Sequence, residues 1–215
     1  MINLTNEDNM KLMARYPDNY FELAIVDPPY GIDVALSCPI SKPDRKNTWE
    51  RKEKYTPKNW DNSPPNKKYF DELKRVSKNR VIWGGNYFTN FLNPSKGWIF
   101  WNKLFDKTLN FSHGELAYTS FNSQLKMFTQ SSKAETRGGK DRIHPTQKTV
   151  KLYEWLLMNY ANEGDKILDT HLGSGSIAIA CHNLGFDLVG CELDKEYYEA
   201  ACKRLKQHQA QLTIF

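Results

Sequence analysis

Four residues with clear chemical potential, Asp27-Pro28-Pro29-Tyr30, directly follow the apolar run 23–26. A carboxylate and a neighbouring carbonyl can together accept both N–H groups of an amine, which draws out the nitrogen lone pair and stabilises charge developing on it. The two prolines fix φ and remove two N–H donors, so their carbonyls are free to face a ligand. The tyrosine offers a stacking face for a flat base. The tetrad indicates chemistry on an amine; the plain alternative is a strand that ends in a Pro-Pro turn with a surface tyrosine.

A glycine-rich turn lies near the far end of the chain, between an expected short strand at 166–169 and a helix that runs to residue 184. The turn reads Asp169-Thr170-His171-Leu172-Gly173-Ser174-Gly175. Its glycines let the backbone approach a ligand, and a helix N-terminus favours anionic groups. A second expected strand, 187–192, ends in Glu192, where an acid would meet a ribose diol. Alone, the loop fits NAD or a tight turn equally well; beside the first motif, S-adenosylmethionine fits better.

The two motifs together resemble those of β-class DNA amino-methyltransferases of the adenine-N6/cytosine-N4 type, in which the catalytic tetrad precedes the cofactor loop in a circularly permuted order. The resemblance covers nearly the whole chain and implies that Asp27, Pro28, Pro29 and Tyr30 are the catalytic residues. The family usually has Pro-Phe where this chain has Thr170-His171. It implies an α/β, Rossmann-like fold: a mostly parallel sheet with helices on both faces, and the catalytic strand beside the strand of the cofactor loop.

The same resemblance implies a set of contacts to S-adenosylmethionine. Glu192 would hold the ribose, Asp8 would contact the adenine, and Thr146 and Lys148 would lie near the methionine end. The remaining expected contacts come from the loop itself: Asp169, His171, Leu172, Gly173, Ser174 and Gly175. Pro145 and Thr146 have a simpler interpretation, in which they only start and cap a helix over 147–161.

Hydrophobic periodicity predicts the elements that must position these residues. We expect strands at 22–27, 80–84 and 97–102, a helix near 66–78, a hairpin across 114–130, and a strand–helix–strand–helix unit that ends near Gln209. A chain of 215 residues suits one domain, 1–210. Within it we expect a basic loop, 33–66, and a small target-recognition insert, 103–142. Two glycines follow the strand in the segment 82–88, and relatives have a similar segment near the target base.

The charge balance suits a polyanionic partner such as double-stranded DNA, with a net charge of +5 and a pI near 8.9. The candidates for phosphate contacts cluster in the basic loop: Arg45, Lys46, Arg51, Lys52 and Lys54. A solvated surface is the alternative explanation for such a run. The last residues, Gln211–Phe215, are similar to the pentapeptide that docks on the bacterial sliding clamp, and packing against the chain's own domain is the alternative.

Other classes of protein fit less well. The four cysteines form no Cys-x-x-Cys pair, so neither a metal site nor a disulfide is indicated. There is no basic-then-apolar leader, and no apolar run approaches the length needed to cross a bilayer, so we expect a cytoplasmic protein. Relatives are often dimers, which makes a homodimer an expectation by analogy.

These patterns predict S-adenosylmethionine-dependent methylation of DNA at adenine N6, of the restriction–modification kind. We expect the base to flip out, Tyr30 to stack on it, and Asp27 with the Pro28 carbonyl to hold the amine during one direct displacement. Cytosine N4 is the first alternative, although relatives that modify cytosine more often begin the tetrad with Ser. RNA, a glutamine amide on a protein, and a non-catalytic DNA- or clamp-binding protein of the same fold stay open.

Overall fold

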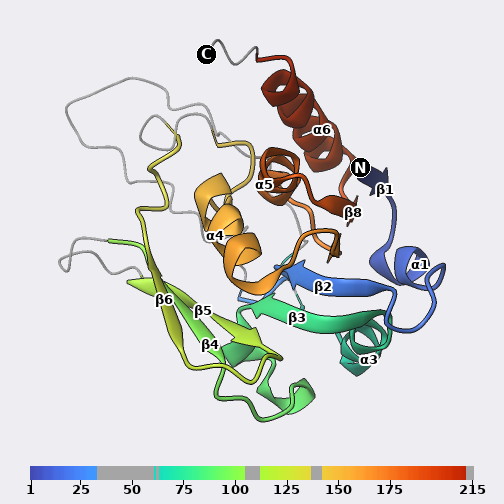
Figure 1. Cartoon of the computed structure of the whole chain (residues 1–215), viewed down its shortest axis with the longest axis vertical. Helices are drawn as coiled ribbons and strands as arrows, with labels where there is room; N and C mark the ends of the chain where they lie inside the picture. Colours follow the sequence, from blue (N-terminus) through green and yellow to red (C-terminus); the bar gives the residue numbers. More distant parts are fainter. Residues whose placement is uncertain (33–60, 62, 105–111, 137–141, 212–215) are drawn as a thin grey trace, which may run out of the picture.

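The protein is described by a computed structural model over residues 1–32, 61, 63–104, 112–136 and 142–211 (Figure 1). In this part of the chain, one eight-stranded sheet has the order β1-β8-β7-β2-β3-β5-β4-β6. The strands are β1 Ile2–Asn6, β2 Phe21–Val26, β3 Ser77–Trp83, β4 Trp98–Asn102, β5 Gly114–Thr119, β6 Lys126–Thr129, β7 Lys166–Asp169 and β8 Asp187–Glu192. The helices are α1 Asn9–Met13, α3 Lys67–Val76, α4 Val150–Tyr160, α5 Ser176–Leu184 and α6 Lys195–Gln209, with short 3-10 turns η1 Gly85–Tyr87 and η2 Thr89–Phe91.

Five neighbouring strands, from β1 to β3 in the sheet order, run parallel. Strand β5 is antiparallel to both of its neighbours, β3 and β4, and β6 closes this edge parallel to β4. The expected fold class, an α/β Rossmann-like sheet that is mostly parallel with antiparallel pieces at one edge, is confirmed.

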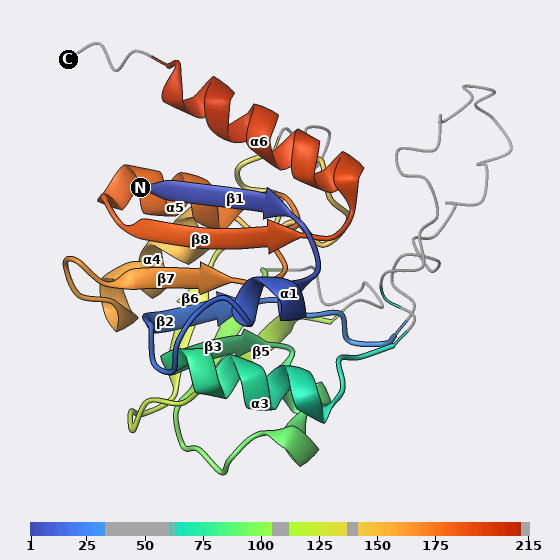
Figure 2. The same cartoon turned by 90° about the vertical axis from the view of Figure 1, so that its right-hand side faces the viewer.

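Two hydrophobic cores lie on the two faces of the sheet, and strand alternation divides the side chains between them. Leu23 and Ile25 of β2 join the core that α4, α5 and α6 cover. Ala24 and Val26 of the same strand join the core that α1 and α3 cover. Figure 2 shows α1 and α3 in front of the sheet with α4 and α5 behind it. Because both faces are covered at the centre of the sheet, strand β2 is apolar along nearly its whole length.

The hairpin expected across 114–130 is wrong. Strands β5 and β6 do not pair with each other, because β4 lies between them and pairs with both. Two side chains of β4, Ile99 and Trp101, are fully buried, whereas Met127 of β6 is 59% exposed. The more apolar strand therefore takes the inner position and the polar one takes the edge, where a strand is exposed on one side.

The helix expected over 147–161 begins later, at Val150. Its N-cap is Thr149, whose side chain accepts a hydrogen bond from the Leu152 N–H. The Glu135 carboxylate accepts from the N–H groups of Val150 and Lys151, so the first turn is satisfied without Pro145 or Thr146. The sequence interpretation also missed β1 and α1. Among the described residues, no helix has the length and apolar character needed to cross a membrane.

Candidate active site

The carboxyl ends of four parallel strands, β1, β8, β7 and β2, meet at one edge of the sheet. Strands β2 and β7 are direct neighbours, with Ala24 opposite Leu168, so the catalytic strand does lie beside the strand of the cofactor loop, as expected. A cavity of about 720 Å³ opens at this edge. Its lining includes Asp8, Asp27, Lys148, Gly173 and Glu192. Ligands of open α/β sheets bind at this edge, where the strand order reverses.

Both carboxylate oxygens of Asp27 are occupied. Oδ1 accepts a hydrogen bond from the Tyr30 hydroxyl at 2.8 Å, and Oδ2 accepts one from Lys148 Nζ at 2.5 Å. Burial raises the pKa of Asp27, while the Lys148 ammonium and the Tyr30 hydroxyl oppose that rise. Asp27 and Pro29 line the cavity, and Pro28 is buried beside them. An amine that binds Asp27 therefore shares the carboxylate with these two partners or competes with them.

Lys148 lies between two carboxylates. Its side chain is only 2% exposed, and Nζ is also 3.0 Å from Glu115 Oε2. Lys103 forms an ion pair with the other oxygen of Glu115. Although burial acts to raise it, the pKa of Glu115 is lowered to about 2 by the Lys148 and Lys103 ammonium groups. We call Asp27, Lys148, Glu115 and Lys103 the charge chain; the sequence interpretation identified its first two members and missed the last two.

Tyr30 is fixed from its backbone to its hydroxyl. Its N–H and that of Gly31 donate to Asp61 Oδ1 at 2.8 and 3.0 Å. Its ring stacks on Tyr87, with centroids 5.0 Å apart and planes inclined by 15°. Gly84 lies so close to the same ring that an added Cβ would be 2.2 Å from Tyr30 Cε1. The segment 82–88, expected near the target base, thus contacts Tyr30 directly.

The glycine loop is held by two acids, the buried Asp169 and the partly buried Glu192. Asp169 Oδ1 accepts the His171 N–H at 2.9 Å, and Glu192 Oε2 accepts the Gly173 N–H at 2.8 Å. Burial raises the pKa of Asp169 to about 8 and also raises that of Glu192. Gly173 and Gly175 have φ of 51° and 69°, a region that disfavours residues with a Cβ. The loop therefore turns tightly from β7 into α5 while its N–H groups stay near the cavity.

His171 stands where the family usually has an aromatic residue. Its Nε2 is 3.1 Å from Asn9 Nδ2, and its Nδ1 is 3.0 Å from Thr170 Oγ1. Burial lowers its pKa to about 4, so the imidazole is neutral near pH 7. Because the Asn9 amide donates to Nε2, the ring proton is assigned to Nδ1. His171 lines the cavity as a flat, uncharged ring, and it packs edge-on against Tyr69.

The remaining expected contacts have mixed local roles. Asp8 lines the cavity, yet its carboxylate already caps α1 by accepting from the N–H groups of Met10 and Lys11. Thr146 lines the cavity with its hydroxyl 3.1 Å from His144 Nδ1. Leu172 and Ser174 also belong to the lining. Ser176 donates to the Lys148 carbonyl at 2.7 Å, which ties the segment 144–148 to the cofactor loop.

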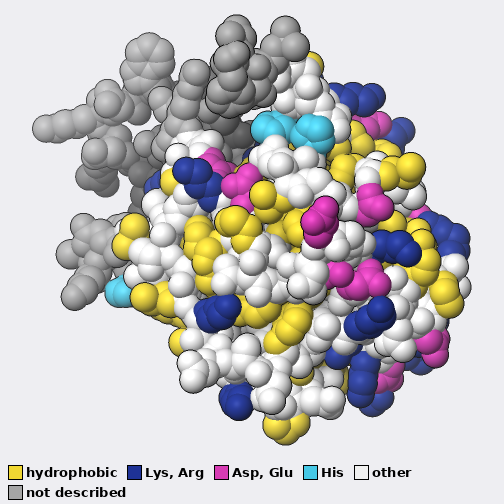
Figure 3. All heavy atoms as spheres, viewed as in Figure 1, with side chains coloured by type: hydrophobic (Ala, Val, Ile, Leu, Met, Phe, Trp, Pro, Cys, Tyr) yellow, Lys and Arg dark blue, Asp and Glu magenta, His cyan; other side chains and the backbone are white. Residues whose placement is uncertain are grey.

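The expected phosphate contacts, Arg45, Lys46, Arg51, Lys52 and Lys54, lie outside the described residues, as does most of the tail 211–215. The range 103–142 contributes β5 and β6 to the central sheet, in addition to any recognition role. On the face drawn in Figure 3, basic and acidic side chains of the described residues are interspersed.

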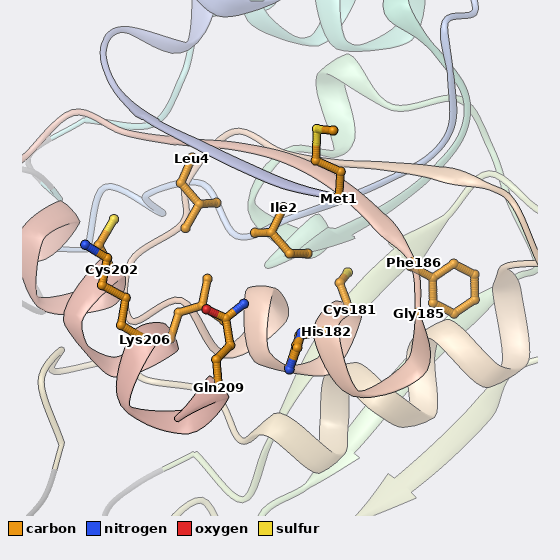
Figure 4. Close-up of a pocket in the computed structure, with 11 residues that line it drawn as sticks. Met1, Ile2, Leu4, Cys181, His182, Gly185, Phe186, Cys202, Lys206 and Gln209 are labelled. Atoms are coloured by element: carbon orange, nitrogen blue, oxygen red, sulfur yellow. The ribbon is translucent and has the colours of Figure 1, made fainter. Parts of the chain in front are cut away.

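A second cavity, of about 480 Å³, lies between β1, α5 and α6 (Figure 4). Residues on its wall include Met1, Leu4, Cys181, His182 and Gln209. Its lining shares no residue with that of the larger cavity. The chemistry predicted from the sequence is therefore confined to the larger one.

The larger cavity suits a nucleoside linked to a cationic amino acid. Glu192 and the Gly173 N–H are placed for a ribose and its neighbours, and a flat neutral ring, His171, stands close by. Asp27, Lys148 and Thr146 lie on the same lining. The residues present thus fit S-adenosylmethionine in size and in chemistry.

Comparison with solved structures supports the same fold. The M1.HpyAVI complex with S-adenosylmethionine matches 95% of this chain and 100% of its own, with a TM-score of 0.63 and 19% identity. The cytosine-N4-specific PvuII DNA methyltransferase matches 100% of this chain and 88% of its own, with a TM-score of 0.62 and 12% identity.

Comparison of sequences is more specific. The type II methyltransferase M2.DpnII of Streptococcus pneumoniae is 30% identical over 142 residues, which are 64% of this chain and 52% of that protein. The chain thus spans about half the length of this curated relative. The model of the N6/N4 DNA methylase family matches residues 42–203, and the cofactor of that family is S-adenosylmethionine. The chain therefore belongs to the DNA methylase family of the N6/N4 methyltransferase type.

Proposed function

We propose that this protein is a site-specific DNA methyltransferase that modifies the N6 amino group of adenine. The observation that carries the proposal is the position of Asp27: it ends β2 in the larger cavity, beside the strand that leads into the glycine loop. Bound in that cavity, S-adenosylmethionine supplies an activated methyl group. The carboxylate side of the site, rather than a covalent intermediate, then has to stabilise the charge that develops on the amine.

The residues of the site divide this work. Asp27 accepts one N–H of the amine and the Pro28 carbonyl accepts the other, which frees the nitrogen lone pair. Tyr30 supplies the surface on which the flipped base stacks, and base stacking on an aromatic ring contributes roughly 1–3 kcal/mol. The Tyr30 ring contacts Gly84 and Tyr87, and its backbone N–H donates a hydrogen bond to Asp61. The product proton can leave after transfer, so Asp27 need not be a strong base.

Methylation of cytosine at N4 is the second candidate function, and a structural comparison supports it. A cytosine-N4-specific enzyme shares this fold over the whole chain. The exocyclic amines of adenine and cytosine need the same two acceptors, so Asp27 serves both. Asp at the first position of the tetrad supports adenine, because cytosine-modifying relatives more often have Ser there.

The proposal is tested by mass spectrometry of nucleosides from DNA that has been incubated with the purified protein and S-adenosylmethionine. Methyladenine is the expected product, and Asp27→Asn is expected to lower its yield at least ~100-fold while cofactor affinity is retained. Asp18→Asn, at an acid that is 72% exposed and pairs with Arg75, serves as the matched control and should keep activity. Methylcytosine would move the substrate to the second candidate, and binding of the cofactor without any methylated base on DNA or RNA would contradict catalysis.

The partners of the protein are part of the proposal. Double-stranded DNA is the substrate, with Arg45, Lys46, Arg51, Lys52 and Lys54 as phosphate contacts in a cytoplasmic protein that acts as a monomer or a homodimer. We propose that residues 1–210 form the catalytic domain and that residues 103–142 recognise the target sequence. The tail Gln211–Phe215 is proposed to dock on a sliding clamp, and clamp binding that survives its removal would refute this.

A further inference from the structure

The charge chain poses a problem for an incoming amine. Each carboxylate oxygen of Asp27 already accepts one hydrogen bond, Oδ1 from the Tyr30 hydroxyl and Oδ2 from Lys148 Nζ. A base amine that approaches Oδ2 therefore competes with the Lys148 ammonium for it. Lys148 is 2% exposed, and an ammonium group displaced from Asp27 without another partner would be left buried and unpaired. Such a group costs several kcal/mol of free energy, which would oppose substrate binding.

The structure contains a second acceptor within reach of the same ammonium. Glu115 Oε2 is 3.0 Å from Lys148 Nζ, close enough for an ion pair. This oxygen is buried, and its geometry satisfies no hydrogen bond among the described residues. The other oxygen, Oε1, pairs with Lys103. Glu115 is thus anchored by one oxygen, and its other oxygen already lies in ion-pair contact with Lys148.

Neighbouring residues confine Lys148 to this pair of acceptors. Its Nζ lies 5.1 Å from the centre of the Trp83 ring, and Lys103 Nζ lies 5.0 Å from the Trp101 ring. Glu115 is opposite Trp101 in the pairing of β5 with β4, so two strands fix its position. A shift of the Lys148 ammonium from Asp27 to Glu115 is therefore short and requires no exposure to solvent.

We propose that Glu115 is a positioning residue of the methylation site: it takes over the Lys148 ammonium when the base amine binds, and so frees Asp27 Oδ2 to accept the amine N–H. This inference rests on the proposed function for its role in turnover, but the exchange itself is a property of the charge chain. No bond is made or broken in this step; one hydrogen bond of Lys148 is exchanged for another.

Stability alone gives little reason for this arrangement. Buried ion pairs are often no more stabilising than apolar side chains of similar volume, because the charges lose hydration. This chain of four charges also ends at Asp27, on the wall of the larger cavity. A positioning role accounts for both facts.

The test compares Glu115→Gln with Glu199→Gln, a matched substitution at an exposed acid outside the charge chain. In Glu115→Gln the side chain keeps its size but offers no negative charge to Lys148, which stays on Asp27. Turnover of DNA at saturating S-adenosylmethionine is expected to fall ~10- to 100-fold, whereas the dissociation constant for the cofactor changes less than ~2-fold. Glu199→Gln makes the same change at an acid that is 62% exposed and pairs with Lys195, so turnover should stay within ~3-fold of the wild type. Equal losses in the two variants, or unchanged turnover in Glu115→Gln, would overturn the proposal.

A second readout does not depend on turnover. The other charged or titratable groups whose fields reach Asp27 are Tyr30, Tyr69, Glu115, Lys148, Tyr153 and Asp169. Removal of the Glu115 charge alone should lower the pKa of Asp27, measured by NMR of ¹³C-labelled aspartate, because Lys148 then serves one carboxylate instead of two. An unchanged or raised pKa would contradict the exchange. If the wild type methylates no base, the proposed function fails, and this titration still decides the inference.

Should Glu115→Gln fail to bind the cofactor, Glu115→Asp replaces it in both measurements. The shorter side chain keeps its charge but withdraws the carboxylate from Lys148. Lower turnover with retained cofactor affinity supports the exchange, and wild-type turnover contradicts it.

Discussion

At the scale of single residues, the site is defined by which polar atoms already have partners. Asp27 binds Tyr30 and Lys148, and the acids at the cofactor loop, Asp169 and Glu192, bind backbone N–H groups. These three acids thus already have partners, so a ligand that binds them competes with existing contacts. Exchange of equivalent hydrogen bonds costs little free energy, whereas a buried group that is left alone costs about 1–3 kcal/mol.

Two substitutions at Tyr30 distinguish the contribution of its ring from that of its hydroxyl. Tyr30→Phe keeps the stacking ring and removes the hydroxyl that occupies Asp27 Oδ1, so we expect kcat/KM for DNA to stay within ~3-fold of the wild type. Tyr30→Ala also removes the ring, and a loss of ~1–3 kcal/mol in stacking corresponds to a ~5- to 160-fold lower kcat/KM. Steady-state kinetics on one DNA substrate measure both. Equal losses in the two variants would show that the hydroxyl, rather than the ring, is the functional group.

At the scale of elements, the site depends on turns as much as on strands. Strand β3 ends at Trp83, and the turn that begins with Gly84, φ 67°, brings Tyr87 onto the Tyr30 ring. A left-handed residue is needed there, and the close approach of Tyr30 leaves no room for a Cβ. Sequence reasoning singled out the two glycines of this segment as room for a ligand; the structure shows that the first of them accommodates Tyr30.

Gly84→Ala and Gly185→Ala form a matched pair. Both glycines have positive φ, 67° and 76°, but a Cβ at Gly185 meets nothing within 4 Å. Strain alone should cost each variant ~1–2 kcal/mol of unfolding free energy. Gly84→Ala must also displace Tyr30, so it should lose more stability than Gly185→Ala and at least ~10-fold in turnover, while Gly185→Ala keeps turnover. Urea unfolding and nucleoside analysis check this; similar turnover in the two variants would contradict a role of the turn in holding Tyr30.

At the scale of the whole molecule, the cavity at the carboxyl edge concentrates buried ionisable groups, which couples folding to pH. Burial raises the pKa of Asp169 to about 8 and lowers that of His171 to about 4. Between about pH 4 and 6.5 the two effects oppose each other: the folded state holds an extra proton on Asp169, and the unfolded state holds one on His171. Above about pH 6.5 only the Asp169 effect remains.

We therefore expect the free energy of unfolding to fall as pH rises from about 6.5 to 8, by about 1–2 kcal/mol, and to level off above that range. The sign follows because the folded state binds more protons than the unfolded state in this window. Asp169→Asn, which keeps an acceptor for the His171 N–H, should flatten the curve. Urea unfolding at several pH values measures it, and an equal slope in the variant would assign the effect to other groups.

The sequence by itself determined the elements whose apolar runs are continuous or periodic: β2, β3, β4, β7, β8 and the helices between them. It also determined the tetrad, the glycine loop and Glu192, because these residues follow strands directly, and parallel strands bring such positions to one edge of a sheet. The apolar run alone was enough to place these residues, because neither the strand nor the residue that follows it depends on a distant partner.

Only the tertiary structure decided which residues meet across long separations in sequence. Glu115 and Lys103 join the site because β5 pairs with β3 and β4 pairs with β5, an order that the short link between residues 119 and 126 did not indicate. Helix α4 begins at Val150 because Glu135 reaches its first turn from another segment. Both outcomes follow from burial and from hydrogen bonds to distant groups, which local propensity does not contain.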